Sequence, residues 1–217
     1  MDLFSTQQTD KLEILPDAYL LKGFALSEQT QLVAGLHHVI TLSPFRRMVT
    51  PGGFTMSVAM SNCGNLGWTT ARTGYRYTTY DPLSDAPWPV LPEAFLTLAR
   101  RAATQAGYQD FNPDACLINR YNIGARMALH QDKNELDYSQ PIVSVSLGLS
   151  AVFQLGGFQR TDKAIKVSLD HGDVVVWGGS SRMRYHGILP LKAGINPPNI
   201  TPALSDCRIN LTFRKAG

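Results

Sequence analysis

Hydrophobic and polar residues alternate along the segment 207–214, near the C-terminal end of the chain. Its apolar positions are Ile209, Leu211 and Phe213, and its polar positions are Arg208, Asn210, Thr212 and Arg214. Side chains on a β-strand point alternately to its two faces. The segment is therefore predicted to be a strand with one apolar face and one face that carries two guanidinium groups, an amide and a hydroxyl. Such a polar face either meets water or lines a cavity that holds an anion.

Short runs of β type follow one another from residue 116 onward, with turn signals such as Gly156-Gly157 and Gly178-Gly179 between them. The predicted strands span residues 116–121, 142–148, 151–155, 166–169, 173–177, 184–188 and 208–213. Many short strands at this spacing are typical of a sandwich or barrel. The second half of the chain is therefore expected to form a mainly β structure.

The first half of the chain predicts two helices and a short strand around residues 18–21. Ser27 precedes an acidic residue and an apolar-periodic stretch through residue 39, which is typical of an N-capped amphipathic helix. A second helix is expected to open at Pro92 and to stop at Gly107.

The segment 50–82, between the two helices, is rich in glycine, asparagine and aromatic residues, among them Trp68 and Tyr75. Two interpretations stay open for it. It is a β-hairpin with a few core aromatics, or it is a flexible lid that stacks a planar ligand, because flipped bases are held between aromatic or apolar side chains.

Composition narrows the class of protein only slightly. A chain of 217 residues suits one domain with a sizeable core, with or without an appended recognition element. The net charge of +3 is compatible with a polyanionic partner without indicating one. Three widely spaced cysteines without a CxxC pair favour a reducing compartment. The N-terminus has neither a basic region nor a long apolar run, so no signal peptide or membrane span is expected.

A metal site is suggested by His130-Gln131-Asp132, with His186 as a third ligand. Two residues at this spacing share one face of a strand, and two histidines with one carboxylate are the ligand set of non-heme Fe(II) oxygenases. A second H-x-D, His171-Gly172-Asp173, lies at a glycine turn and close before His186, so the first is favoured. The alternative is that His130 is an ordinary core or surface histidine.

Asn119 and Tyr121 share one face of the predicted strand 116–121. Polar side chains that point inward are costly unless they are satisfied. They form an inter-strand network or lie at an exposed edge, or they bind a dicarboxylate together with Arg208, since arginine binds a carboxylate through two parallel hydrogen bonds. Arg214 serves the same cavity from the far end of its strand, or it is a solvated terminal charge.

The sequence resembles the AlkB family of Fe(II)- and 2-oxoglutarate-dependent nucleic-acid dealkylases, and most closely its bacterial DNA-repair members. The motifs that carry this resemblance occur in order over most of the chain. They are Thr50-Pro51-Gly52-Gly53, Asn119-Arg120-Tyr121, His130-Gln131-Asp132-Lys133, 143–148, 172–179, His186-Gly187-Ile188 and 208–214.

The resemblance implies a mainly β fold with flanking helices, in which a double-stranded β-helix (jelly-roll) core carries an N-terminal nucleotide-recognition lid. Residues 1–110 would supply the N-terminal helices and the lid, packed on the core rather than independent of it. Residues 111–217 would form the Fe(II)/2-oxoglutarate dioxygenase core.

The resemblance also assigns roles to single residues. The iron ligands and catalytic residues would be His130, Asp132 and His186. The residues that bind 2-oxoglutarate would be Asn119, Tyr121, Arg208, Asn210 and Arg214. Trp68 would stack on the flipped base, with Tyr75 and Arg160 holding the nucleic acid. Asn134, followed by Glu135, stands where the best-known members carry an acid, which puts the preference for particular bases in question.

The implied function is direct-reversal repair of alkylated DNA, with RNA left open as a second substrate. Fe(II), 2-oxoglutarate and O₂ would demethylate bases such as 1-methyladenine and 3-methylcytosine, with release of succinate, CO₂ and formaldehyde. A cytoplasmic monomer without a membrane partner is expected. Two alternatives remain: a 2-oxoglutarate-dependent hydroxylase of a protein or small molecule, and a cupin-like metal-binding module without catalysis. Arg208 argues against the last, since a plain metal-binding barrel needs no buried cation there.

Overall fold

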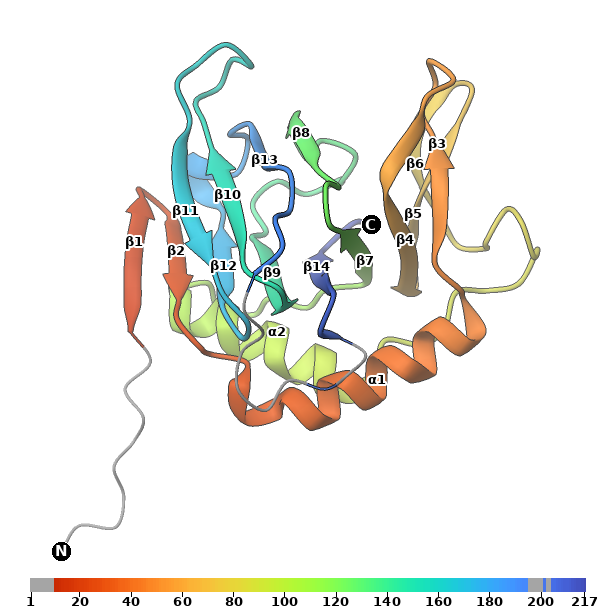
Figure 1. Cartoon of the computed structure of the whole chain (residues 1–217), viewed down its shortest axis with the longest axis horizontal. Helices are drawn as coiled ribbons and strands as arrows, with labels where there is room; N and C mark the ends of the chain where they lie inside the picture. The colour runs from red at the N-terminus through yellow and green to blue at the C-terminus, as the bar shows by residue number, and fades with distance from the viewer. Residues whose placement is uncertain (1–9, 195–200, 202–203) are drawn as a thin grey trace, which may run out of the picture.

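The computed structural model describes residues 10–194, 201 and 204–217. Two antiparallel sheets enclose the centre of the molecule (Figure 1). The larger has eight strands in the order β1-β2-β12-β9-β14-β7-β4-β3, and the smaller has four in the order β11-β10-β13-β8. The first nine residues, where no signal peptide is expected, lie outside the described residues.

The larger sheet takes strands from both halves of the chain. They are β1 (Lys11–Leu15), β2 (Ala18–Leu21), β3 (Arg46–Val49), β4 (Thr55–Gly64), β7 (Ala115–Asn122), β9 (Ile142–Gly148), β12 (Val174–Trp177) and β14 (Cys207–Arg214). The smaller sheet consists of β8 (Met127–His130), β10 (Ala151–Leu155), β11 (Ile165–Leu169) and β13 (His186–Ile188). This arrangement of two antiparallel sheets with flanking helices confirms the predicted jelly-roll class.

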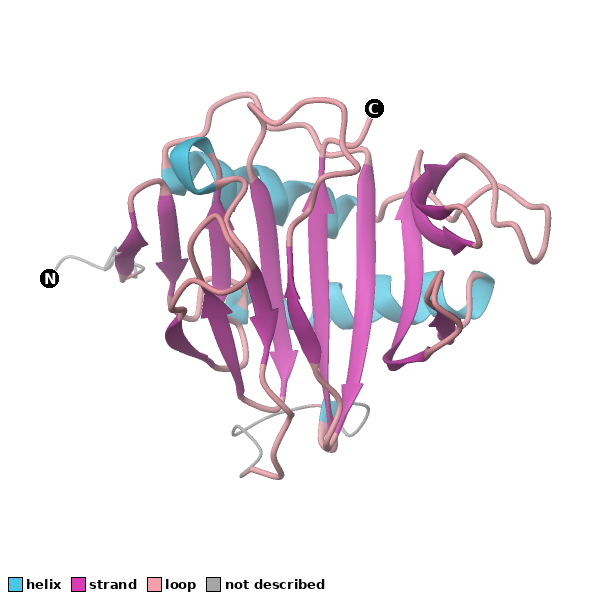
Figure 2. Cartoon of the chain, turned by 90° about the horizontal axis from the view of Figure 1, so that it is seen from above, coloured by secondary structure: helices cyan, strands magenta, loops and turns pink. Residues whose placement is uncertain are grey.

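Two helices cover the outer face of the larger sheet and run across its strands (Figure 2). They are α1 (Gln29–Leu42) and α2 (Glu93–Ala106). A first apolar core joins them to the sheet, and within it the rings of Phe95 and Phe213 meet edge to face at 6.1 Å. Neither helix is long and apolar enough to cross a membrane, and the described residues contain no other helix that is.

The two helices differ in how they begin and end. A 3-10 turn (Leu26–Glu28) leads into α1, and no side chain caps that helix, so the predicted capping role of Ser27 is wrong. The second helix starts after Pro92 and stops at Gly107, as predicted. Gly107 has a φ of +103°, a left-handed conformation that glycine adopts without the steric cost of a β-carbon.

Strand β14 is buried on both of its faces. Its apolar side chains Ile209, Leu211 and Phe213 join the core beneath the helices. Its polar side chains face the space between the two sheets, where a second apolar core contains Phe153 and Trp177. The polar face therefore lines a cavity and does not face bulk water. The alternation in the sequence alone left both possibilities open.

A separate two-stranded hairpin, β5 (Gly67–Ala71) and β6 (Gly74–Thr78), stands beside the sheets. Trp68 lies opposite Tyr77, and Thr70 lies opposite Tyr75, so these four side chains share one face of the hairpin. The β-hairpin of the first interpretation is therefore present, and stacking on a planar ligand stays a prediction. Its aromatic face turns toward the loop that follows β8, as the hydrogen bonds described below show.

Candidate active site

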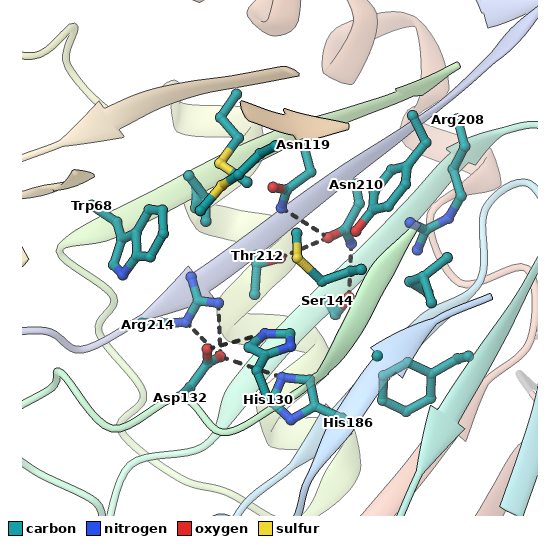
Figure 3. Close-up of a pocket in the computed structure, with 18 of the residues that line it drawn as sticks. Trp68, Asn119, His130, Asp132, Ser144, His186, Arg208, Asn210, Thr212 and Arg214 are labelled. Atoms are coloured by element: carbon teal, nitrogen blue, oxygen red, sulfur yellow. Dashed lines mark hydrogen bonds and ion pairs between the residues drawn. The ribbon is translucent and has the colours of Figure 1, made fainter. Parts of the chain in front are cut away.

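Three potential metal ligands converge between the sheets, where β8 and β13 pair (Figure 3). His130 ends β8, and His186 begins β13 directly opposite it. Asp132 follows His130 by two residues, and one donor atom from each of the three side chains lies within 4.8 Å of the other two. Asp132 lies in the loop after β8 rather than on the strand, so the expected shared strand face is wrong although the expected proximity is present.

The backbone fixes the orientation of both imidazoles. Nδ1 of His130 donates to the carbonyl oxygen of Ala128 at 2.9 Å, and Nδ1 of His186 donates to that of Arg184 at 3.1 Å. Since a carbonyl oxygen can only accept, each ring presents the lone pair of Nε2 to the site. Burial lowers the pKa of His186 to about 3, so this imidazole is neutral and free to bind a cation.

The Asp132 carboxylate lies between the two imidazoles, with Oδ1 3.7 Å from Nε2 of His130 and Oδ2 3.7 Å from Nε2 of His186. Burial is the largest single effect and would raise its pKa, but the Arg214 guanidinium and the two nearby imidazoles together outweigh burial and hold the pKa of Asp132 below its usual range. Two imidazoles and one ionised carboxylate are the donor set of a facial Fe(II) site.

The second H-x-D sequence has structural partners elsewhere. Nδ1 of His171 accepts a hydrogen bond from the Gly148 amide at 3.0 Å, and its other ring nitrogen meets Gln29. Asp173 accepts from Lys22 Nζ at 2.6 Å and from the Gly23 amide at 2.8 Å. These contacts tie strand ends together. Among the described residues, the one group of three potential ligands is the set that contains His130.

A pocket with an empty volume of about 660 Å³, partly open to solvent, extends from this triad between the sheets. It is lined by most of the residues singled out from the sequence. They are Trp68, Asn119, Tyr121, His130, Asp132, His186, Arg208, Asn210 and Arg214. Tyr75, Asn134 and Arg160 do not line it.

Arg208 is a buried cation at this pocket, only 1% exposed. Nη2 donates to the Ser146 hydroxyl at 2.9 Å, and the guanidinium lies 5.1 Å from the centre of the Tyr121 ring. Nε and Nη1 have no partner among the described residues. Burial lowers the pKa of Arg208, which reflects the cost of holding this cation without an anion. A carboxylate of a bound dicarboxylate would offer an acceptor to this guanidinium.

The amides of Asn119 and Asn210 form an inter-strand network inside the pocket. Asn119 Nδ2 donates to Asn210 Oδ1 at 3.3 Å, and Thr212 donates to the same oxygen at 2.8 Å. Asn210 Nδ2 donates to the Ser144 hydroxyl at 2.8 Å. Asn119 therefore takes part in an inter-strand network, and among the described residues its Oδ1 is a buried acceptor without a partner.

Arg214 lies at the metal end of the same strand face. Its Nε and Nη2 both donate to Oδ2 of Asp132, at 2.9 and 2.7 Å. Figure 3 shows this guanidinium beside the carboxylate rather than beside Arg208. The alternative of a solvated terminal charge is wrong, since Arg214 is 6% exposed.

Of the aromatic residues of the hairpin, Trp68 lines the pocket, and Tyr75 lies against it. The rings of Trp68 and Tyr75 are stacked, with centroids 5.0 Å apart and planes inclined by 16°. Asn134 bridges them, because its Oδ1 accepts from Trp68 Nε1 at 3.5 Å and its Nδ2 donates to the Tyr75 carbonyl at 3.3 Å. Arg160 lies apart, with its guanidinium 5.6 Å from the ring centre of Tyr185, the residue before His186.

Several pocket residues were given no role in the site from the sequence. They are Met56, Met60, Met127, Ser144, Phe153, Trp177, Gly187 and Ile188. One signal could have found Ser144: in Val143-Ser144-Val145-Ser146 a serine at every second position marks a polar face on an apolar strand. The methionines carry no such signal, because an isolated methionine in a strand is indistinguishable from ordinary core.

Comparison with known proteins gives a consistent result. The 2OG-Fe(II) oxygenase superfamily matches residues 17–214. "Alpha-ketoglutarate-dependent dioxygenase AlkB" of Escherichia coli (strain K12) is 56% identical over 217 residues, which covers 100% of this chain and 98% of that protein. "Alpha-ketoglutarate-dependent dioxygenase AlkB homolog" of Caulobacter vibrioides is 41% identical over 88% of this chain and 83% of its own length. The structure of OsALKBH1 superposes with a TM-score of 0.84 at 30% identity, over 95% of this chain and 100% of that one.

Proposed function

The chain belongs to the AlkB family of the 2OG-Fe(II) oxygenase superfamily, and we propose that it removes alkyl groups from damaged bases of DNA. It is a dioxygenase that uses Fe(II), with 2-oxoglutarate and O₂ as co-substrates, and the family acts on nucleic-acid bases by oxidative dealkylation. One observation carries the assignment to this chain's own residues: a His-Asp-His triad and a buried arginine with free donors line one pocket, beneath an aromatic hairpin.

In this proposal His130, Asp132 and His186 hold the iron, and the hydrogen bonds of the two Nδ1 atoms keep the ligand nitrogens aimed at it. When bound, Fe(II) with 2-oxoglutarate and O₂ supplies the oxidising power that converts an N-methyl group to released formaldehyde, with succinate and CO₂ as the other products. The protein's contribution is to bind, to orient and to exclude water.

Arg208 is assigned to the distal carboxylate of 2-oxoglutarate, because its two free donors are buried and need an anion. Asn119, Tyr121 and Asn210 line the same cavity and are assigned to the remainder of the co-substrate. Arg214 is assigned to the opposite end, where it already holds Asp132 and would meet a carboxylate close to the metal. Fixing both ends of the co-substrate sets its orientation before reaction.

The hairpin is assigned to the base. Trp68 lines the pocket and offers an aromatic surface for stacking, Tyr75 supports it from behind, and Asn134 tethers both. Arg160 is assigned to the nucleic-acid backbone. Residues 1–110 would thus supply base recognition and residues 111–217 the oxygenase core, although the larger sheet draws β1 to β4 from the first part.

The proposed substrates are 1-methyladenine and 3-methylcytosine in DNA. Their alkylation blocks base pairing, and an unpaired base is cheaper to extrude from the helix. A role as a monomer in the cytoplasm fits a repair enzyme of bacterial type, and RNA is a second candidate substrate. Hydroxylation of a protein or small molecule is the rival within the same chemistry, and the stacked aromatic rim disfavours it.

The test begins with the class of enzyme. Fe(II) and 2-oxoglutarate, added together without oxygen, should give a weak visible absorption band that neither gives alone. A methylated oligonucleotide should then accelerate the consumption of 2-oxoglutarate in air, and an unmethylated one of the same sequence should not. Acceleration by peptides or free amino acids instead would assign the chain to the rival function.

A further inference from the structure

The hairpin and the metal-binding loop are joined through one buried carboxylate, that of Glu135. This side chain is 5% exposed. Its Oε1 accepts a hydrogen bond from the Tyr77 hydroxyl of β6 at 2.7 Å, and its Oε2 accepts one from Arg182 Nη2 at 3.1 Å. Tyr77 lies on the same face of the hairpin as Trp68 and directly opposite it. Both oxygens of Glu135 are therefore engaged, one by the hairpin and one by the core.

Arg182 holds the loop on which both acids lie. It is 2% exposed, just after the 3-10 turn Gly179–Ser181. Besides Glu135, its guanidinium donates to the carbonyl oxygen of Asp132 at 2.8 Å and to that of Gln140 at 3.2 Å. A single planar group thus fixes both ends of the loop 132–140.

Arg214 closes the network on the metal side. Its Nε lies 3.5 Å from Oε1 of Glu135 and 2.9 Å from Oδ2 of Asp132. The buried cluster therefore contains two guanidinium groups and two carboxylates. Buried ions are tolerated when they are paired in this way, and removing one partner leaves an uncompensated charge.

We propose that Glu135 is a positioning residue, which ties the hairpin through Tyr77 to the metal-binding carboxylate of Asp132 through Arg182 and Arg214. The inference rests on the proposed role of Asp132 as a metal ligand. It assigns two separable effects to one side chain. The charge of Glu135 balances the two guanidinium groups beside a dication site, and its hydrogen bond to Tyr77 sets the height of the hairpin over the pocket.

A separate variant tests each of these two effects. Glu135→Gln keeps the shape but removes the charge, which leaves one carboxylate against two guanidinium groups and a net positive charge that repels a divalent cation. Metal-free Glu135→Gln should bind Mn²⁺ about tenfold more weakly than the parent, the order found for outer-sphere partners of metal ligands. Glu135→Asp keeps the negative charge on a shorter side chain and should restore most of the Mn²⁺ affinity. Mn²⁺ binding is measured by the loss of the free-ion electron paramagnetic resonance signal.

Tyr77→Phe removes only the hydrogen bond between Glu135 and the hairpin, since Glu135 keeps its contacts with Arg182 and Arg214. Its Mn²⁺ affinity should equal that of the parent. Its KM for a methylated oligonucleotide should rise, and more succinate should form for each formaldehyde, because a looser hairpin positions the base less well while co-substrate turnover continues. Tyr80→Phe is the matched control: Tyr80 follows three residues later, is 54% exposed and should leave all of these values unchanged.

Two outcomes would overturn the inference. One is a Glu135→Gln protein that binds Mn²⁺ as tightly as the parent. The other is a Tyr77→Phe protein with the parental KM and the parental ratio of succinate to formaldehyde. If Glu135→Gln does not fold, Arg182→Lys tests the same connection. Lysine keeps the positive charge but lacks the planar guanidinium that donates to the Asp132 carbonyl oxygen. If the parent protein did not act on methylated oligonucleotides at all, the proposed function would be refuted. The Mn²⁺ measurements would still test the role of Glu135.

Discussion

His130 and His186 lie directly opposite each other on the neighbouring antiparallel strands β8 and β13, with ring centroids 4.4 Å apart. The pairing of these strands, rather than proximity in the sequence, creates the metal site. Asp132 then reaches the two imidazoles from the loop after β8. The same geometry separates this triad from His171, which is engaged by Gly148 and Gln29.

Loss of any one triad side chain should abolish dealkylation. His130→Ala, Asp132→Ala and His186→Ala each remove one of three protein ligands, and few ligands remain to hold the ion. Far-ultraviolet circular dichroism should stay close to that of the parent for the two histidine variants. His171→Ala is the matched control and should keep its metal affinity. A His171→Ala protein that folds normally but has lost metal as completely as His130→Ala would contradict the assignment.

Arg208 should determine the affinity for 2-oxoglutarate. Arg208→Ala should raise the KM for 2-oxoglutarate at least about tenfold, since hydrogen bonds to charged groups contribute about 1.5–3 kcal/mol. Arg208→Lys should rescue only part of this, because lysine lacks the planar fork. Steady-state kinetics at saturating Fe(II) gives the constants. Arg100→Ala, on the exposed side of α2, serves as the control. An unchanged KM in both Arg208 variants would exclude the role.

Trp68 should contribute to binding of the damaged strand but not to co-substrate turnover. Trp68→Ala should weaken binding of a methylated oligonucleotide by about 1–3 kcal/mol, the contribution of one base stacked on an aromatic ring. Fluorescence anisotropy measures the binding. Consumption of 2-oxoglutarate without nucleic acid should persist, because the triad and Arg208 are untouched. An equal loss of that uncoupled turnover would point to a purely structural tryptophan.

Asn134→Asp should increase the preference for cationic bases. Asn134 tethers Trp68 and Tyr75 through hydrogen bonds but carries no charge. An acid there would attract a cationic base, although solvent at the exposed position 134 weakens the attraction. Glu135 does not supply this charge, because it is buried and faces Arg182 and Tyr77. The ratio of rates on 3-methylcytosine and neutral 3-methylthymine should rise in the variant. A ratio that stays level or falls would mean that position 134 does not read the charge of the base.

The sequence predicted the elements whose periodicity was strong. The alternation in β14 gave the strand and its polar face, and Pro92 with Gly107 bounded α2 within a residue at each end. Strand β8 was missed, since it has four residues, none of them fully buried. Short half-exposed strands have little alternation to detect, and pairing with a distant neighbour decides whether they form.

Side-chain partners across the fold were the least predictable feature. Arg214 was expected at the co-substrate cavity and does line the pocket, but its ion pairs with Asp132 and Glu135 were not predicted. Glu135 itself reads as an ordinary surface acid, because glutamate is rarely buried unless it is paired. Its partners Tyr77 and Arg182 come from distant parts of the chain, and no local pattern connects them.

The central claim is that this pocket oxidises the alkyl group of a damaged base. It is tested most directly by incubating the enzyme with Fe(II), 2-oxoglutarate, O₂ and an oligonucleotide that contains one 3-methylcytosine. Unmodified cytosine should appear in equal amounts with formaldehyde, and both should vanish when Fe(II) or 2-oxoglutarate is left out or when His130 is replaced by alanine. An enzyme that consumes 2-oxoglutarate normally but leaves 3-methylcytosine intact would contradict the claim.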